Sequence, residues 1–83
     1  MKKTAKTRRK NIVGSRVRQA RLQHRPYVSQ DDLAGRLAAQ GILLDRSAVS
    51  RIESQGRYLM DYEIAAIARA LKVSVAWLFG EKL

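Results

Sequence analysis

The sequence lacks cysteine, has a single histidine, His24, and contains no long apolar run. Without cysteine the chain forms neither a disulfide nor a thiolate metal site, and one histidine is too few for a site built from imidazoles. The longest strongly apolar run, Ile42–Leu44, is far shorter than the roughly 18 residues of a membrane span. The charged start has no apolar segment behind it, so we expect no secretory signal. We therefore expect a soluble, cytoplasmic protein without a metal or cofactor.

Few residues have the chemistry of an active site. His24 lies among cations beside Arg25 and Pro26, and no serine has a histidine base in a recognisable arrangement. The adjacent acids Asp31 and Asp32 lie in the expected first turn of a helix, where negative charge stabilises the helix. The glycines are scattered and match no phosphate-binding loop. We expect that the protein is not an enzyme.

The positive charge is concentrated near the N-terminus. The 83-residue chain has a formal net charge of +10. Residues 1–25 hold ten Lys and Arg and no acid, whereas residues 26–83 hold seven Lys and Arg and seven acids. This distribution favours a polyanion partner, nucleic acid before a membrane, because the basic segment lacks the Trp, Phe and Leu face of an interfacial helix. The alternative is a solvated tail that only aids solubility.

Length and periodicity predict one all-α domain. Residues 1–10 are too polar to bury anything, so we expect a flexible basic arm there and a domain at residues 11–83. In that domain apolar residues recur at spacings of three and four, in segments separated by Pro, Gly or capping residues. The expected helices lie at about 11–24, 30–40, 46–54, 61–73 and 74–80.

Capping residues mark the expected helix starts. Ser29 is the predicted N-cap of the second helix, and Asp32 is expected to return the hydrogen bond in a capping box. Asp45, Asp61 and Ser74 are expected to cap the three helices that follow.

The connection between the second and third helices is long. Seven residues separate Leu37 from Asp45, whereas a helix-turn-helix motif uses a turn of roughly 3–4 residues. The residues after Leu37 are good or fair helix formers, so we expect the second helix to continue as far as Gly41. Ile42–Leu44 would then enter the core, and Gly56 would mark the end of the third helix.

The third helix has an exposed face of the kind that enters a DNA groove. Val49 and Ile52 mark its core side, because residues advance by 100° around a helix. The opposite face holds Arg46, Ser47, Ser50, Arg51 and Ser54. Serines permit close approach, and arginines reach guanine O6 and N7 or a phosphate. The same pattern is equally typical of a solvated helix face.

Four fragments in order resemble one known family: "IVGSRVRQARL", "SQDDLAGRL", "RSAVSRIE" and "DYEIAAIARALKVSVAWLFG". They are similar to the lambda-repressor-like, Cro/repressor-type helix-turn-helix family of DNA-binding domains, also called Xre-type. The resemblance covers Asn11 to about Gly80 and implies a compact five-helix domain whose second and third helices form the motif. Two segments are longer than usual, the one before Ser29 and the connection before the third helix, and Gly56 lies later than the usual glycine.

The resemblance implies roles for individual residues. The residues that match base-reading positions are Arg46, Ser47, Ser50 and Arg51. The resemblance also places Ser29 and Gln30, at the start of the second helix, and Arg57 on phosphates. Arg9 and Lys10 lie outside the resemblance, and we expect them to add phosphate contacts because they belong to the basic arm. Arg21 and Glu53 match a pair that often forms an ion pair behind the motif.

The resemblance therefore implies a sequence-specific regulator of transcription that binds double-stranded DNA, a repressor of the bacterial or phage type associated with the nucleoid. The chief alternative is a protein-interaction module of the same fold, such as an antitoxin or adaptor, with Trp77 and Phe79 as anchors. The same two residues would form a homodimer contact through the C-terminal helix. No small-molecule ligand is implied.

Overall fold

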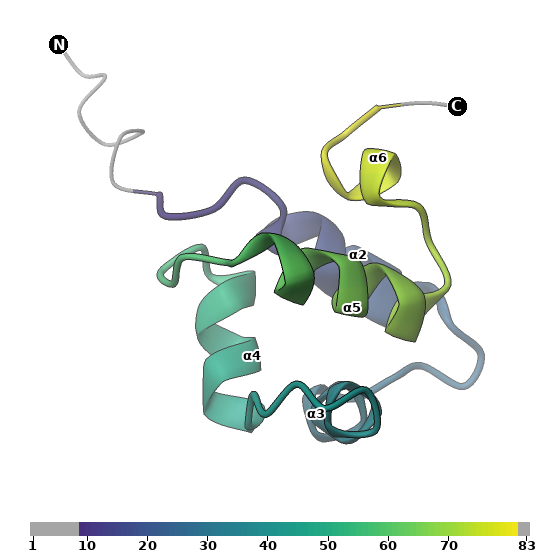
Figure 1. Ribbon diagram of the computed structural model, residues 1–83. Coiled ribbons are helices and arrows are strands. Elements are labelled where there is room, and N and C mark those ends of the chain that lie inside the picture. The colour runs from purple at the N-terminus through teal and green to yellow at the C-terminus, as the bar shows by residue number, and fades with distance from the viewer. Residues whose placement is uncertain (1–8, 82–83) are drawn as a thin grey trace, which may run out of the picture.

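The computed structural model describes residues 9–81, and this part of the chain is all-α with no strand, as predicted (Figure 1). Its helices are α2 (Gly14–Gln23), α3 (Gln30–Ala38), α4 (Arg46–Glu53), α5 (Asp61–Leu71) and α6 (Val75–Leu78). Helices α2 and α5 pack together, α3 and α4 cover one side of this pair, and α6 covers the other. The arm predicted at residues 1–10 lies outside the described residues except for Arg9 and Lys10.

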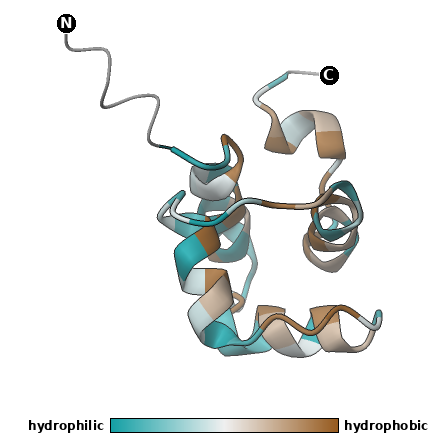
Figure 2. Cartoon of the chain, turned by 60° about the vertical axis from the view of Figure 1, so that its left-hand side comes forward, coloured by the Kyte–Doolittle hydropathy of each residue, from teal (hydrophilic) through white to brown (hydrophobic). Residues whose placement is uncertain are grey.

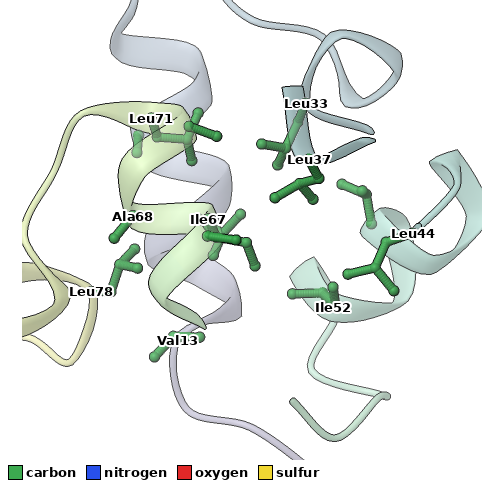
Figure 3. Close-up of a cluster of buried hydrophobic side chains, with 14 of the residues drawn as sticks. Val13, Leu33, Leu37, Leu44, Ile52, Ile67, Ala68, Leu71 and Leu78 are labelled. Atoms are coloured by element: carbon green, nitrogen blue, oxygen red, sulfur yellow. The ribbon is translucent and has the colours of Figure 1, made fainter. Parts of the chain in front are cut away.

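The helices enclose one apolar core. In Figure 3 the side chains of Leu37 from α3, Ile67 from α5 and Ile52 from α4 point toward a common interior, and each is at most 1% exposed. Leu78 of α6 is fully buried against the far side of α5. Even the longest helix, α5, has 11 residues, and isolated helices shorter than about 12–15 residues are marginal in water. The core therefore stabilises the helices.

Three of the predicted caps are confirmed. The Ser29 hydroxyl accepts a hydrogen bond from the Asp32 backbone N–H (2.9 Å), and the Asp32 carboxylate accepts one from the Ser29 N–H (3.1 Å), which completes the capping box. Asp45 accepts from the Ala48 N–H at the start of α4 (2.9 Å). Ser74 accepts from the Trp77 N–H at the start of α6 (2.9 Å). These starts depend on residues within four positions of one another, which is why the sequence predicted them.

The predicted cap at Asp61 is wrong. Asp61 is the first residue of α5, and Met60 precedes the helix. The Asp61 carboxylate accepts from the adjacent Tyr62 N–H (2.6 Å), so it does not reach the later N–H groups that a cap binds. Glu63, the third residue of α5, accepts a hydrogen bond from the N–H of Met60, the residue before the helix (2.9 Å).

The predicted start of the first helix is also wrong, since α2 begins at Gly14 rather than Asn11. The Asn11 side-chain carbonyl accepts from the N–H groups of Val13 (3.1 Å) and Gly14 (2.8 Å). An asparagine side chain that binds nearby backbone in this way competes with helical hydrogen bonding and favours a position before the helix. The helix ends at Gln23, three residues before Pro26.

Helix α3 ends at Ala38, short of the predicted residue 40, although Gly41 turns the chain as predicted; α4 does not close at the predicted glycine. Gly41 has a left-handed backbone (φ +82°), and the Ile42 N–H returns to the Leu37 carbonyl (2.9 Å). At the end of α4 the left-handed residue is Gln55 (φ +66°), not Gly56. The Gly56 N–H binds the Arg51 carbonyl (2.9 Å) in the manner of a Schellman motif, which places the preceding residue in the left-handed region.

The expectation that the whole of Ile42–Leu44 enters the core is wrong at its middle residue. Ile42 is half-buried and Leu44 is 7% exposed, whereas Leu43 is 85% exposed. The Leu44 N–H binds the Ile42 carbonyl (3.2 Å), which makes a three-residue turn with Leu43 at its centre. The turn directs its two outer side chains inward and its central one outward.

Candidate nucleic-acid interface

One side of α4 is open to solvent and carries all the residues predicted to read bases. The exposed residues are Arg46, Ser47, Ser50 and Arg51. On the opposite side Ala48, Val49 and Ile52 are buried in the core. The Arg51 guanidinium donates to the Ser47 hydroxyl one turn earlier (3.2 Å), which holds the arginine along the helix. Figure 2 shows hydrophilic and hydrophobic colours alternating along α4, and hydrophilic colours at the start of the described chain. The structure thus brings the four residues together on one face.

A hollow borders the Arg46 edge of α4. It is lined by Arg21, Tyr27, Ser29, Gln30, Asp31 and Arg46. Ser29 and Gln30, predicted to contact phosphate, therefore lie beside the leading residue of the exposed face. The Gln30 amide donates one hydrogen bond to Glu53 (3.1 Å), and an amide has a second N–H and a carbonyl for other partners.

A groove borders the Arg51 edge of α4. It is lined by Ala34, Gly35, Ala38, Leu43, Leu44, Asp45, Ala48, Arg51 and Arg57. Arg57 is another predicted phosphate contact, and the structure places it beside Arg51 in this groove. Its guanidinium forms an ion pair with the Glu63 carboxylate (3.2 Å) and donates to the Tyr58 carbonyl (3.0 Å). Arg57 is therefore partly neutralised but still partly exposed, with 27% of its side chain accessible.

The described end of the basic arm lies at the C-terminal end of α4. The Lys10 backbone N–H donates to the Gln55 carbonyl (2.9 Å), and its ammonium group lies 5.4 Å from the centroid of the Tyr58 ring. Arg9 is exposed. Arg9 and Lys10, the arm residues predicted to contact phosphates, therefore lie near the C-terminal end of α4, as Arg57 does.

A buried ion pair supports α4 from behind. Arg21 binds Glu53 through Nε–Oε2 (2.6 Å) and Nη2–Oε1 (2.8 Å), and its Nη1 donates to the Val28 carbonyl (2.9 Å). The two charged side chains are only 7% and 4% exposed. Hydrogen bonding to Glu53 raises the pKa of Arg21. The pair that the family resemblance implied is confirmed, and Arg21 is a structural residue rather than a free cation.

Sequence reasoning missed the junction between α2 and the end of α4. The Asn11 amide donates to the carbonyls of Ile52 (3.1 Å) and Arg57 (2.9 Å), and the Gln55 amide donates to the Asn11 carbonyl (3.1 Å). Gly14 lies so close that a Cβ there would be 2.1 Å from the Ile52 carbonyl oxygen. A glycine inside a helical pattern is a signal of such close approach, but the sequence does not name the partner.

The aromatic residues of α6 lie away from the α4 face. Helix α6 covers the side of the α2 and α5 pair opposite α3 and α4 (Figure 1). Trp77 is half-buried, and the Arg16 guanidinium lies 4.5 Å from the centroid of its ring. Phe79 and Val75 are 43% and 42% exposed. Any partner of α6 would therefore bind at a surface separate from α4.

Other kinds of site have little support in the described part of the chain. Across residues 9–81 no group of His, Asp or Glu side chains is arranged to hold a metal ion. No helix in that range is long and apolar enough to cross a membrane. His24 is half-buried and its Nε2 lies 3.0 Å from the Leu71 carbonyl oxygen, at the end of α5.

No family model, curated protein or solved structure matches the chain.

Proposed function

We propose that the protein is a sequence-specific regulator of transcription that binds double-stranded DNA through a lambda-repressor-like helix-turn-helix formed by α3 and α4. The main support for this proposal is the exposed face of α4. Four polar or cationic residues share that face, while the core, α3 and the buried Arg21–Glu53 pair hold the helix from behind. Such a helix presents side chains outward without having to rearrange.

The size of α4 supports its insertion in the major groove. An α-helix with its side chains is about 10–12 Å across, and the major groove of B-DNA, about 12 Å wide, admits it. Ser47 and Ser50 allow the backbone to approach the base edges. Arg46 and Arg51 occupy the two edges of the face, so their guanidinium groups would reach base pairs on either side of the serines.

Phosphate contacts would flank this face on both sides. Ser29 and Gln30 lie beside Arg46, at the N-terminus of α3, where backbone N–H groups favour anions. Asp31 lines the same hollow and weakens that attraction, so we assign most of the electrostatic attraction to Arg57, Lys10, Arg9 and the rest of the arm. Phosphate contacts orient a protein on DNA, whereas base contacts supply the specificity.

Selection from a random duplex library, followed by sequencing, tests the proposal directly. We expect one enriched motif, and binding to it should weaken steeply with salt, with a log–log slope of about 0.9 for each neutralised phosphate. The proposal is wrong if no duplex is preferred over competitor DNA at moderate salt.

Arg51→Ala tests the assignment of bases to α4. We expect it to relax preference at one or two positions of the selected motif, at a cost of about 1–3 kcal/mol in discrimination. Arg69→Ala is the matched control, since it removes the same charge from α5, where Arg69 hydrogen-bonds to Gln40 (2.9 Å). The control should keep the selected motif unchanged. A uniform loss across all sequences with Arg51→Ala would instead make Arg51 a phosphate contact.

The exposed apolar surface at α6 supports an addition to this proposal: two copies of the protein associate through Phe79, Val75 and the exposed edge of Trp77. A dimer formed there would bind two half-sites about one helical turn, or ~10 bp, apart. The same selection would then yield a palindrome. The rival function, a protein-interaction module, predicts the reverse pattern: Trp77→Ala would abolish the biological effect while Arg46→Ala with Arg51→Ala would leave it intact.

A further inference from the structure

Leu43 is the most exposed large apolar side chain among residues 9–81. A single exposed leucine is common on protein surfaces and indicates nothing by itself. Its backbone setting is more informative, because Leu44 on one side is buried and Ile42 on the other is half-buried. The Leu44 N–H also binds the Ile42 carbonyl (3.2 Å) across the turn. Leu43 is therefore held outward by two anchored neighbours.

The side chain lies next to the exposed face of α4. Leu43 lines the same groove as Arg51 and Arg57, a hollow of about 640 Å³ between α3 and α4. The floor from α3 consists of small residues, Ala34, Gly35 and Ala38. Figure 2 shows the connection between α3 and α4 as a hydrophobic stretch. An apolar group and two cations thus share one side of the helix.

The charges that line this groove are complementary to DNA, which is anionic. Arg51 and Arg57 are cationic, and the single acid that lines the groove, Asp45, uses its carboxylate to cap α4 through the Ala48 N–H. The one apolar group that base pairs present in the major groove is the 5-methyl group of thymine. A leucine beside a base-reading arginine is complementary to that methyl group.

We propose that Leu43 is a specificity-determining residue that contacts the 5-methyl group of a thymine next to the base pair read by Arg51. This inference rests on the proposed function. It assigns to the lengthened connection a part in sequence recognition, in addition to joining the two helices.

The test compares thymine with deoxyuracil, which differs only by the methyl group. Each thymine of the selected duplex is replaced in turn by deoxyuracil, and Kd is measured for the wild type and for Leu43→Ala. At one position the wild type should lose about fourfold in affinity, the value expected for one buried methyl group. Leu43→Ala should bind the thymine and deoxyuracil forms of that position equally well. Leu43→Met should restore the preference.

Leu22→Ala serves as the control, because it also truncates an exposed leucine, but on α2. It should keep the thymine preference of the wild type. The inference is overturned if Leu43→Ala keeps that preference, if it weakens binding to every duplex equally, or if it changes the oligomeric state, which would make Leu43 a contact between copies. If no duplex is selected at all, the proposed function fails and this inference fails with it. Equal melting temperatures of the wild type and Leu43→Ala show that folding is unaffected.

Discussion

Gly14→Ala should destabilise the protein strongly, although alanine is the better helix former. A Cβ at this position would lie 2.1 Å from the Ile52 carbonyl oxygen and 3.0 Å from that of Glu53. Both are backbone atoms at the C-terminal end of α4, so no side-chain rotation relieves the contact. Reaching the 3.4 Å of ordinary van der Waals contact requires α2 and α4 to separate by at least about 1.3 Å.

The expected magnitude combines three effects. Overpacking of this kind costs about 1–3 kcal/mol, and separating the helices also breaks the Asn11–Ile52 hydrogen bond, worth about 1 kcal/mol. Alanine offsets about 0.4–1 kcal/mol by restricting the unfolded chain. We therefore expect a net loss of about 1–3.6 kcal/mol, which lowers the melting temperature of a domain this small by at least about 4 °C.

Gly35→Ala is the matched control for this prediction. Gly35 lies in α3, and a Cβ there would meet nothing within 4 Å. We expect a gain of about 0.4–1 kcal/mol and a higher melting temperature. Thermal unfolding followed by circular dichroism, together with urea titration, measures both variants. The reasoning is refuted if Gly14→Ala melts at or above the wild-type temperature, or if the two variants shift in the same direction.

Three further predictions concern charge and backbone. Hydrogen bonds from the Ser29 backbone N–H and hydroxyl lower the pKa of Asp32. The ionised Asp32 carboxylate therefore stabilises the fold above the ordinary carboxyl pKa, and this stabilisation is lost as the pH falls. The melting temperatures of the wild type and Asp32→Asn should converge below about pH 4. Lys72 has a left-handed backbone (φ +58°) at the end of α5, so Lys72→Gly should raise stability by about 1 kcal/mol in urea titration. An unchanged or lower midpoint would contradict this. Glu53→Ala leaves Arg21 buried without its partner and should lower the free energy of unfolding by about 3–5 kcal/mol. The double variant Arg21→Met with Glu53→Leu should recover most of that loss. Equal urea midpoints for the single and double variants would count against this prediction.

Local signals predicted the five described helices and the starts of α3, α4 and α6. The all-α class follows from the spacing of apolar residues, and the caps at Ser29, Asp45 and Ser74 follow from side chains that bind N–H groups three positions later. The prediction failed at Asp61, where an acid of the right type binds the next residue instead. Residue type alone does not distinguish a cap from the first residue of a helix.

The exposed face of α4 was also predictable, because Val49 and Ile52 determine which side of an eight-residue helix faces the core. The surroundings of that face were not. The sequence separates Arg46 from Gln30 and Arg51 from Leu43, and only the packing of α3 against α4 places these residues along the edges of one surface.

By itself the sequence determined where the chain is helical, which side of each helix is apolar and where the positive charge gathers, since each of these depends on neighbours within one or two turns. The tertiary structure decided the rest. It placed Gly14 against the Ile52 carbonyl, 38 residues away in the chain, and it joined the Asn11 amide to the carbonyls of Ile52 and Arg57. It also turned Leu43 outward, because burying Leu44 and half-burying Ile42 leaves the residue between them no inward direction.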